Sequence, residues 1–312
     1  MNKRLSKLTV LGVLTTGFIY LLNTIVDRKA QRKNLLPAQG RFYTYKNTDI
    51  FYSVKGTGTP ILLIHDLMPQ ASGYEWEKVR RKLEKTHKVY VIDLPGCGRS
   101  EKPWMTYTAY YFVECIHGFL KEVIKEKTIL IASGLSAHLA ILTDNMYPDS
   151  VEKVILINPE KLSSADQNPD TRGKVIKFLI DLPIFGRFIY NIEMSEENLS
   201  HLFYEMYFMK KNRVDGRMIA TYYEAAHRGI GDGRHLLASL RGHYLNANVR
   251  NACKDLDNLC IITSRERKVG YMIQKEYEKY AKSAETAQVS GSKLLPQLET
   301  PDHLADVIKL FL

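Results

Sequence analysis

The sequence predicts an α/β fold, with a mostly parallel sheet of eight strands flanked by helices, a helical insertion and an N-terminal transmembrane helix. Three observations lead to this prediction. Short apolar runs without polar alternation, such as Ile61–His65, alternate with helix-like stretches, as expected for strands buried on both faces of a sheet. Residues 160–250 contain no strand-like run, and their helical patterns rich in Tyr, Phe and Met predict the insertion. Residues 8–26 contain no charged side chain.

The uncharged run Leu8–Val26 has 19 residues, and a helix of that length spans ~28 Å, nearly the hydrocarbon thickness of a bilayer. It predicts a single-pass membrane anchor within residues 1–39, with the lipid bilayer as its partner and a basic stalk behind it. The alternative is a cleaved signal peptide. That alternative fits less well, because DRKAQRK follows the run in place of an A-x-A-like cleavage site. Both flanks are positively charged, so the side of the membrane that holds the folded part stays open.

Eight segments are expected to form the sheet, separated by turns and helices as in other alternating strand–helix folds. The expected strands are Phe42–Tyr45, Asp49–Lys55, Ile61–His65, Val89–Asp93, Thr128–Ala132, Val154–Asn158, Leu259–Thr263 and Thr286–Val289. The expected helices outside the insertion are Tyr74–Thr86, Thr108–Lys125, Ser136–Tyr147, Met272–Ala281 and His303–Leu312.

Composition and charge exclude several classes of protein. The 45% hydrophobic and 25% charged residues are close to globular averages, which excludes a disordered chain. Of the net charge of +10, residues 1–33 carry +6 (seven Lys and Arg against Asp27), so the remainder lacks the basic stripe of a nucleic-acid-binding protein. The nine histidines form no metal-binding pair, and neither Gly56–Gly58 nor Gly229–Gly233 follows a strand and opens a helix. We therefore expect no metal, no cofactor and no nucleic-acid partner.

Four segments, in this order, resemble the α/β-hydrolase superfamily. They are TPILLIHD at 59–66, VYVIDLPGCGRSEKP at 89–103, TILIASGLSAHLAI at 128–141 and SKLLPQLETPDHLADVIKLFL at 292–312. The second is similar to the family's D-x-P-G-x-G-x-S loop, and the third to its strand, nucleophile elbow and helix. The resemblance implies a core made of residues 40–159 and 251–312, and a helical cap at 160–250 over an active-site cleft.

The same resemblance places the Ser-His-Asp positions of the family on residues that cannot do their chemistry. The nucleophile position falls on Gly134, which has no side chain but tolerates the positive φ of the elbow. The acid position falls on Arg267, whose guanidinium would repel a histidine cation. The base position falls on Leu294. Three separate positions are thus predicted to form a degenerate triad.

Backbone groups of Leu67 and Leu135 stand where the family has its oxyanion hole, next to Asp66. The Asp66 carboxylate either opposes a developing oxyanion there or points to solvent. Residues that could restore catalysis are Ser136, Asp66 and Glu160, with Glu266 as a further acid beside the lost one. Ser136 falls in the first turn of a helix, where its hydroxyl is expected to cap a backbone N–H and to diverge from His138.

Three functions follow as hypotheses. The first is a membrane-anchored pseudo-hydrolase that binds a small apolar ligand or a protein without Ser-His-Asp catalysis. The second, the alternative, is an active ester-type hydrolase that uses non-standard residues such as Ser136, Asp66 or Glu160. The third is a structural module whose cleft has filled in. A shared fold does not decide among them.

Overall fold

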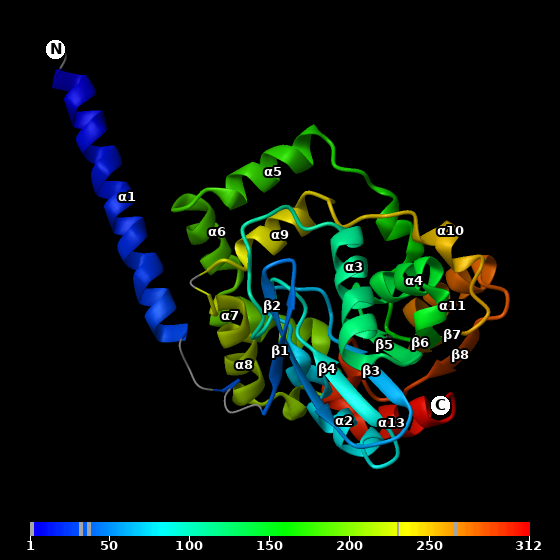
Figure 1. Cartoon of the computed structure of the whole chain (residues 1–312). Coiled ribbons are helices and arrows are strands. Elements are labelled where there is room, and N and C mark those ends of the chain that lie inside the picture. Colours follow the sequence, from blue (N-terminus) through cyan, green and yellow to red (C-terminus); the bar gives the residue numbers. More distant parts are fainter. Residues whose placement is uncertain (1–2, 31–33, 36–38, 230, 265–266) are drawn as a thin grey trace.

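Figure 1 shows a twisted sheet covered by helices, with the long helix α1 (Lys3–Ala30) extending away from the rest of the chain. The computed structural model describes residues 3–30, 34–35, 39–229, 231–264 and 267–312, without the side chains of residues 3–8 and 267. The strands are β1 (Arg41–Tyr45), β2 (Thr48–Lys55), β3 (Pro60–Ile64), β4 (Lys88–Ile92), β5 (Thr128–Ser133), β6 (Val151–Ile157), β7 (Leu259–Thr263) and β8 (Glu285–Gln288).

The eight strands form one sheet in the order β1-β2-β4-β3-β5-β6-β7-β8. β2 pairs antiparallel with both β1 and β4, and every other neighbouring pair is parallel. The predicted mostly parallel α/β sheet is therefore confirmed. Because parallel strands end at the same edge, the segments after β3, β5, β6 and β7 are brought together there.

One group of helices covers both faces of the sheet. A second group follows β6 and precedes β7 along the chain. The first group comprises η1 (Gly73–Trp76), α2 (Glu77–Leu83), α3 (Ala109–Phe119), η2 (Leu120–Ile124), α4 (Ser136–Met146), η3 (Pro148–Ser150), α11 (Arg267–Tyr280), α12 (Pro296–Glu299) and α13 (Pro301–Lys309). The second comprises η4 (Leu162–Asp166), α5 (Thr171–Asp181), α6 (Phe185–Glu193), α7 (Glu196–His201), η5 (Leu202–Tyr207), η6 (Lys211–Arg213), α8 (Gly216–His227), α9 (Arg234–Arg241) and α10 (Val249–Cys253). The structure thus contains the expected cap helices.

The continuously apolar strands explain the two-sided core. All five residues of β3 are buried, and successive side chains point to opposite faces. Leu62 and Ile64 pack into the cluster formed with α3 and α4, whereas Ile61 and Leu63 pack into the cluster formed with α2 and α13. A strand with one wet face would need polar residues at every second position.

The largest difference from a predicted helix boundary is at α11, whereas the ends of α2 and α13 differ by two or three residues. α11 begins at Arg267, five residues before the expected start at Met272, so Arg267 belongs to a helix and not to a loop. Its buried stripe is Gly270, Ile273, Gln274 and Tyr277. Gly270 and Gln274 are not apolar, so the periodic pattern of apolar residues did not mark the first turns of this helix.

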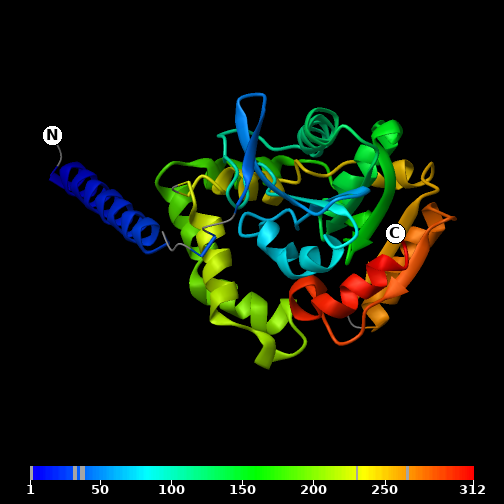
Figure 2. The ribbon, with the colours of Figure 1, turned by 60° about the horizontal axis from the view of Figure 1, so that its bottom comes forward.

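The second half of α1 packs against the cap. Ile19, Asn23, Asp27 and Ala30 are buried along one face of the helix, while residues 9–15 are exposed. By length and composition, Thr9–Ala30 is able to cross a membrane. In both views the C-terminus lies on the far side of the molecule from α1 (Figures 1 and 2).

Candidate functional site

Gly134 forms the tight turn between β5 and α4, where the resemblance places a nucleophile. Its φ is +58°, a conformation that glycine adopts without steric cost. The Gly134 N–H donates to Ile157 O on the neighbouring strand β6. The elbow expected from the sequence is therefore present in the backbone, and Gly134 and Leu135 are only half-buried.

The Asp66 carboxylate lies directly over Gly134. A Cβ placed on Gly134 would be 2.3 Å from Asp66 Oδ1, and Asp66 Oδ1 accepts a hydrogen bond of 2.8 Å from the Leu135 N–H. Of the two orientations expected for Asp66, the inward one is correct and the solvent-facing one is wrong. The carboxylate thus fills the space that a side chain at position 134 would need. It also accepts from the Leu135 N–H, one of the two groups expected at the oxyanion hole. Leu67, which carries the other group, is fully buried.

A second carboxyl group, Glu75 of η1, lies behind Asp66. Glu75 is buried and is held by the Tyr222 hydroxyl at 2.8 Å and by Gln297 Nε2 at 3.2 Å, and its Oε2 is 3.4 Å from the Asp66 N–H. Burial, followed by the negative charge of Asp66, raises the pKa of Glu75 to about 8, although the hydrogen bonds to its carboxylate lower it. At neutral pH the site therefore holds a protonated Glu75 next to Asp66.

The cap closes over this carboxyl pair with two tyrosines. Tyr222 comes from α8, and Tyr207 ends η5 and receives a 3.2 Å hydrogen bond on its hydroxyl from Gln70 Nε2. Burial raises the pKa values of both tyrosine hydroxyls above their ordinary value, so both remain protonated donors. π-Helical turns such as η5 are frequent at functional sites.

His65, next to Asp66 in the chain, cannot serve as the missing base. Its Nε2 accepts from the Leu94 N–H at 2.9 Å, so its Nδ1 carries the proton and donates to Asp66 O at 2.6 Å. The imidazole is fully buried, which lowers its pKa. Both ring nitrogens are therefore committed to backbone groups.

Leu294 lies on the loop between β8 and α12, as expected, and Asn158 holds that loop on the sheet edge. Asn158 Nδ2 lies 2.9 and 3.0 Å from Lys293 O and Leu294 O, and its Oδ1 accepts from the Ser264 N–H at 2.7 Å. The Glu299 carboxylate adds a second clamp, because it accepts from the N–H groups of Met209, Lys210 and Lys293.

We expect Asn158→Ala to lower the free energy of unfolding by about 2–3 kcal/mol, because the change orphans buried backbone groups on two loops. Urea denaturation measures this loss. Asn158→Asp is the matched control. Aspartate keeps the acceptor for the Ser264 N–H, but when ionised it sets a negative charge against two carbonyl oxygens. The variant should therefore lose more unfolding free energy at pH 7 than at pH 4. A loss below about 0.5 kcal/mol for Asn158→Ala would show that the clamp does not hold the loop.

The remaining candidate residues are Ser136, Glu160, Glu266 and Arg267. The Ser136 hydroxyl is buried and has no hydrogen-bond partner among the described residues, so the expected backbone cap is wrong. His138 Nε2 instead lies 3.4 Å from Glu160 O, which also accepts from the Tyr277 hydroxyl at 3.0 Å. Glu160 therefore neighbours His138 and Tyr277. Glu266 and the side chain of Arg267 lie outside the described part of the chain.

Across the described ranges, no hydroxyl or thiol contacts an imidazole at the carboxyl edge of the sheet. A hydroxyl–imidazole contact does occur between Thr86 and His87, at 2.8 Å, but it precedes β4 and so lies at the opposite end of that strand. The same described residues contain no group of three or more His, Cys, Asp or Glu able to hold a metal.

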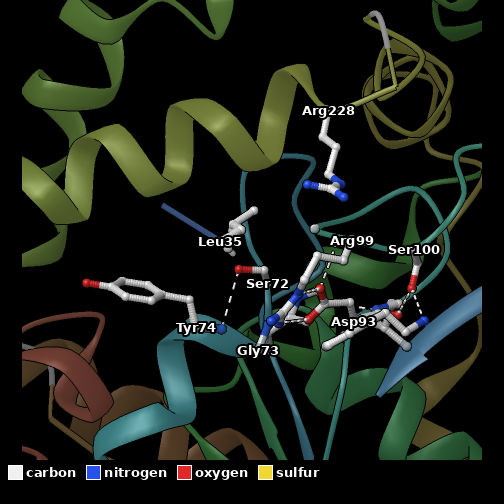
Figure 3. A network of polar contacts seen from close by, with 12 residues as sticks. Leu35, Ser72, Gly73, Tyr74, Asp93, Arg99, Ser100 and Arg228 are labelled. Atoms are coloured by element: carbon white, nitrogen blue, oxygen red, sulfur yellow. Dashed lines mark hydrogen bonds and ion pairs between the residues drawn. The ribbon is translucent and has the colours of Figure 1, made fainter. Parts of the chain in front are cut away.

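The loop after β4 is fixed by a buried ion pair, shown in Figure 3. Arg99 Nε and Nη2 donate to the two Asp93 carboxylate oxygens at 2.7 and 2.9 Å, and the Gly73 N–H donates to Asp93 Oδ1 at 2.7 Å. Burial raises the Asp93 pKa, but the charge and hydrogen bonds of Arg99 outweigh it and lower the pKa to about 2. Arg228 of the cap reaches down toward this pair and lines a hollow of about 430 Å³ together with Arg99.

Arg99→Lys is expected to lower the free energy of unfolding by about 1–2 kcal/mol, because lysine keeps the charge but cannot form the two-pronged contact. Chemical denaturation at pH 7 provides the measurement. Arg81→Lys is the matched control, since Arg81 pairs with Glu77 on the exposed surface, where such pairs contribute little. Equal effects of both substitutions would contradict the prediction.

Sequence patterns did not reveal Glu75, Tyr207 or Tyr222. Glu75 and Tyr222 are 147 positions apart and meet only because the cap folds back over η1. The local signal at Glu75 points elsewhere, because Ser72-Gly-Tyr-Glu75 has the form of a helix-capping box. Ser72 does cap the Tyr74 N–H, but the Glu75 side chain turns inward and accepts from the Tyr222 hydroxyl.

Part of the chain is similar in sequence to curated enzymes. A cis-3-alkyl-4-alkyloxetan-2-one decarboxylase of Shewanella oneidensis is 25% identical over 142 residues, which cover 44% of this chain and 43% of that protein. A 2-hydroxymuconate semialdehyde hydrolase of Pseudomonas sp. is 25% identical over 154 residues, 45% of this chain and 53% of that protein. The chain therefore spans about half the length of the curated relatives it matches.

Solved structures share the fold. A membrane phospholipase A described as a bacterial virulence factor superposes with a TM-score of 0.69 at 18% identity, covering 100% of this chain and 98% of that one. A serine hydrolase of carbazole degradation gives 0.70 at 15% identity, covering 87% and 97%. A sequence profile of the α/β hydrolase fold matches residues 59–228, more than half of the chain. On this match, together with the sheet and the elbow, the chain belongs to the α/β-hydrolase family.

Proposed function

We propose that this protein is a membrane-anchored hydrolase of uncharged esters or lactones, in which the Asp66 carboxylate replaces the serine machinery. The observation that carries the proposal is the place of Asp66, over Gly134 and on the Leu135 N–H. The related decarboxylase and hydrolases favour this active reading over a purely binding role. The degenerate triad at Gly134, Arg267 and Leu294 belongs to the same proposal.

The chemistry is general-base hydrolysis. Asp66 takes a proton from a water molecule, and the water oxygen bonds to the ester carbonyl carbon. When the carbon–oxygen ester bond breaks, the leaving alkoxide takes the proton back from Asp66. A neutral Glu75 supports this step because a second negative charge beside Asp66 would oppose the forming oxyanion. The Tyr222 hydroxyl donates to Glu75, and the Tyr207 hydroxyl accepts from Gln70.

An ester and lactone panel, assayed with the full chain in detergent, tests the proposal. Asp66→Asn keeps the shape and the acceptor for Leu135, so a general-base role predicts a loss of ~10²–10⁴-fold in turnover. Ser136→Ala should retain the activity. A fluorophosphonate probe should label neither the wild type nor Ser136→Ala. Stoichiometric labelling that disappears in Ser136→Ala would overturn the proposal in favour of a serine enzyme.

The second candidate is a ligand-binding pseudo-hydrolase. It is favoured by the same hydrogen bond from Leu135 to Asp66, because that donor is no longer free to stabilise an oxyanion. This role predicts no turnover of any panel member. It also predicts a rise in melting temperature with an apolar ester or lipid, since a ligand that binds only the folded state stabilises it by mass action.

Membrane anchoring by residues 8–26 completes the proposal. It is supported by the length and apolar composition of α1 and by the full-length superposition on a membrane phospholipase A. Carbonate washing of membranes from expressing cells tests it, because an integral protein stays in the pellet. Release of the full chain into the supernatant would contradict the anchor.

A further inference from the structure

Two cap helices expose apolar stripes to their surroundings. On α6, Phe185, Ile189 and Ile192 recur at the spacing of one helix face and are 46%, 41% and 53% exposed. On α5, Val175, Phe178 and Leu179 do the same, with Phe178 63% exposed. We call these six residues the cap apolar face.

The cap apolar face is continuous with the anchor helix, because α1 packs on α6 and α6 packs on α5. The polar residues of α1 form this contact. Asn23 Nδ2 donates to Ile184 O at 3.1 Å, Asn191 Nδ2 donates to Asn23 Oδ1 at 2.9 Å, and Asp27 pairs with Arg187. The side of α1 turned away from the cap is apolar and exposed, as at Phe18 and Leu21.

The position of this contact limits how α1 can span a membrane. The packed face begins at Ile19, so only residues 8–18 of the apolar run are clear of the cap. At ~1.5 Å per residue they cover ~17 Å, about half of the ~30 Å hydrocarbon core. The other ~12 Å of the run, Ile19–Val26, lies alongside α6. A spanning α1 therefore draws α6 into the membrane to a depth close to the ~5–10 Å of interfacial amphipathic helices.

Charges around the cap apolar face suit a lipid headgroup layer. In the segment from Thr171 to Glu193, Lys177 pairs with Asp181 and Arg187 pairs with Asp27 of α1, so the basic residues left for lipid are Arg172 and Lys174. Arg172 and Lys174 are exposed in the first turn of α5. Basic residues beside an apolar helix face are attracted to anionic lipid.

We propose that the cap apolar face is a bilayer-docking surface, immersed in the headgroup and upper acyl region of the same leaflet that α1 enters. The docking rests on the proposed anchoring by α1 and is independent of the chemistry at Asp66. It holds the cap against the membrane and presents the protein to ligands that reside in lipid.

Site-directed fluorescence in the full chain tests the docking. Val13→Cys on α1, Phe178→Cys on α5, Ile189→Cys on α6 and Leu310→Cys would each carry an environment-sensitive NBD probe. The four native cysteines are buried, and Leu310 is 80% exposed at the C-terminus, away from α1. The labelled proteins are reconstituted into vesicles of phosphatidylcholine and phosphatidylglycerol, with and without brominated acyl chains.

The expected result is blue-shifted emission and loss of fluorescence with brominated lipid at positions 13, 178 and 189, and neither effect at position 310. Quenching at 13 but not at 178 and 189 overturns the docking and leaves the anchor intact. In that case a disulfide between two copies of Phe178→Cys identifies a second copy as the occupant. Loss of the effect at position 13 as well overturns both proposals, and equal quenching at position 310 overturns the docking.

Discussion

Glu75→Gln is expected to raise stability at high pH and to leave it nearly unchanged at pH 4–5. The pKa of Glu75 is about 8 in the folded protein against an ordinary 4.5. The folded state therefore holds a proton that the unfolded state releases between these two values, so unfolding free energy falls as pH rises through this window. With about 1.4 kcal/mol per pKa unit, the wild type loses at most ~5 kcal/mol by pH 9. Glutamine stays neutral and avoids this loss.

Melting temperatures of wild type and Glu75→Gln between pH 4.5 and 9 provide the measurement. Other groups titrate in this range, including Asp144, whose pKa burial raises to about 6, so the difference between the two proteins isolates Glu75. Glu77→Gln, two residues along and on the exposed side of α2, is the matched control and should run parallel to the wild type. Parallel curves for Glu75→Gln would show that Glu75 is ionised in the folded protein.

Gly134→Ala should lower the free energy of unfolding by about 3–4 kcal/mol. A side chain at φ +58° costs ~1–2 kcal/mol, and its Cβ would drive the Asp66 carboxylate off the Leu135 N–H, a charge-assisted bond of about 1.5–3 kcal/mol. Gly134→Ser should lose a similar amount and gain no fluorophosphonate labelling, because no imidazole in the described residues is placed to activate it.

A double-mutant cycle between positions 134 and 66 separates the two causes. Asp66→Gly removes the obstructing side chain, so adding Gly134→Ala to it should cost only the backbone strain of ~1–2 kcal/mol. Additive effects of the two substitutions would show that the carboxylate and the elbow do not compete for one space. Urea denaturation of the four proteins at pH 7 is sufficient.

The fold follows from local pattern, whereas much of the site does not. β3 and residues 129–132 of β5 are apolar because both faces of the sheet are covered, and that pattern is visible in the chain itself. The elbow followed from its strand and helix neighbours, and Gly134 adopts the expected positive φ. The sequence left the direction of the Asp66 side chain open, because a carboxylate after a strand end points inward only where a hydrogen-bond donor lies close to it. That partner, the Leu135 N–H, is 69 positions away.

Glu75 illustrates why the remainder was out of reach. Its surroundings include Tyr222 of the cap and Gln297 of α12, which come from two distant segments, and the burial that raises its pKa exists only in the folded chain. No periodicity encodes such a meeting. Gly270 shows the same limit on a smaller scale, since its place in a buried helix stripe is invisible to a pattern built on apolar residues.

The clamp at Glu299 limits how far this edge of the cap can move. Swinging residues 209 and 210 away from the base-position loop breaks two charge-assisted hydrogen bonds, at about 1.5–3 kcal/mol each. A swung-out state at ~3–6 kcal/mol is populated at under one per cent. Met209 and Lys210 therefore stay on the base-position loop almost all of the time, so this edge of the cap is fixed in place and does not act as a gate.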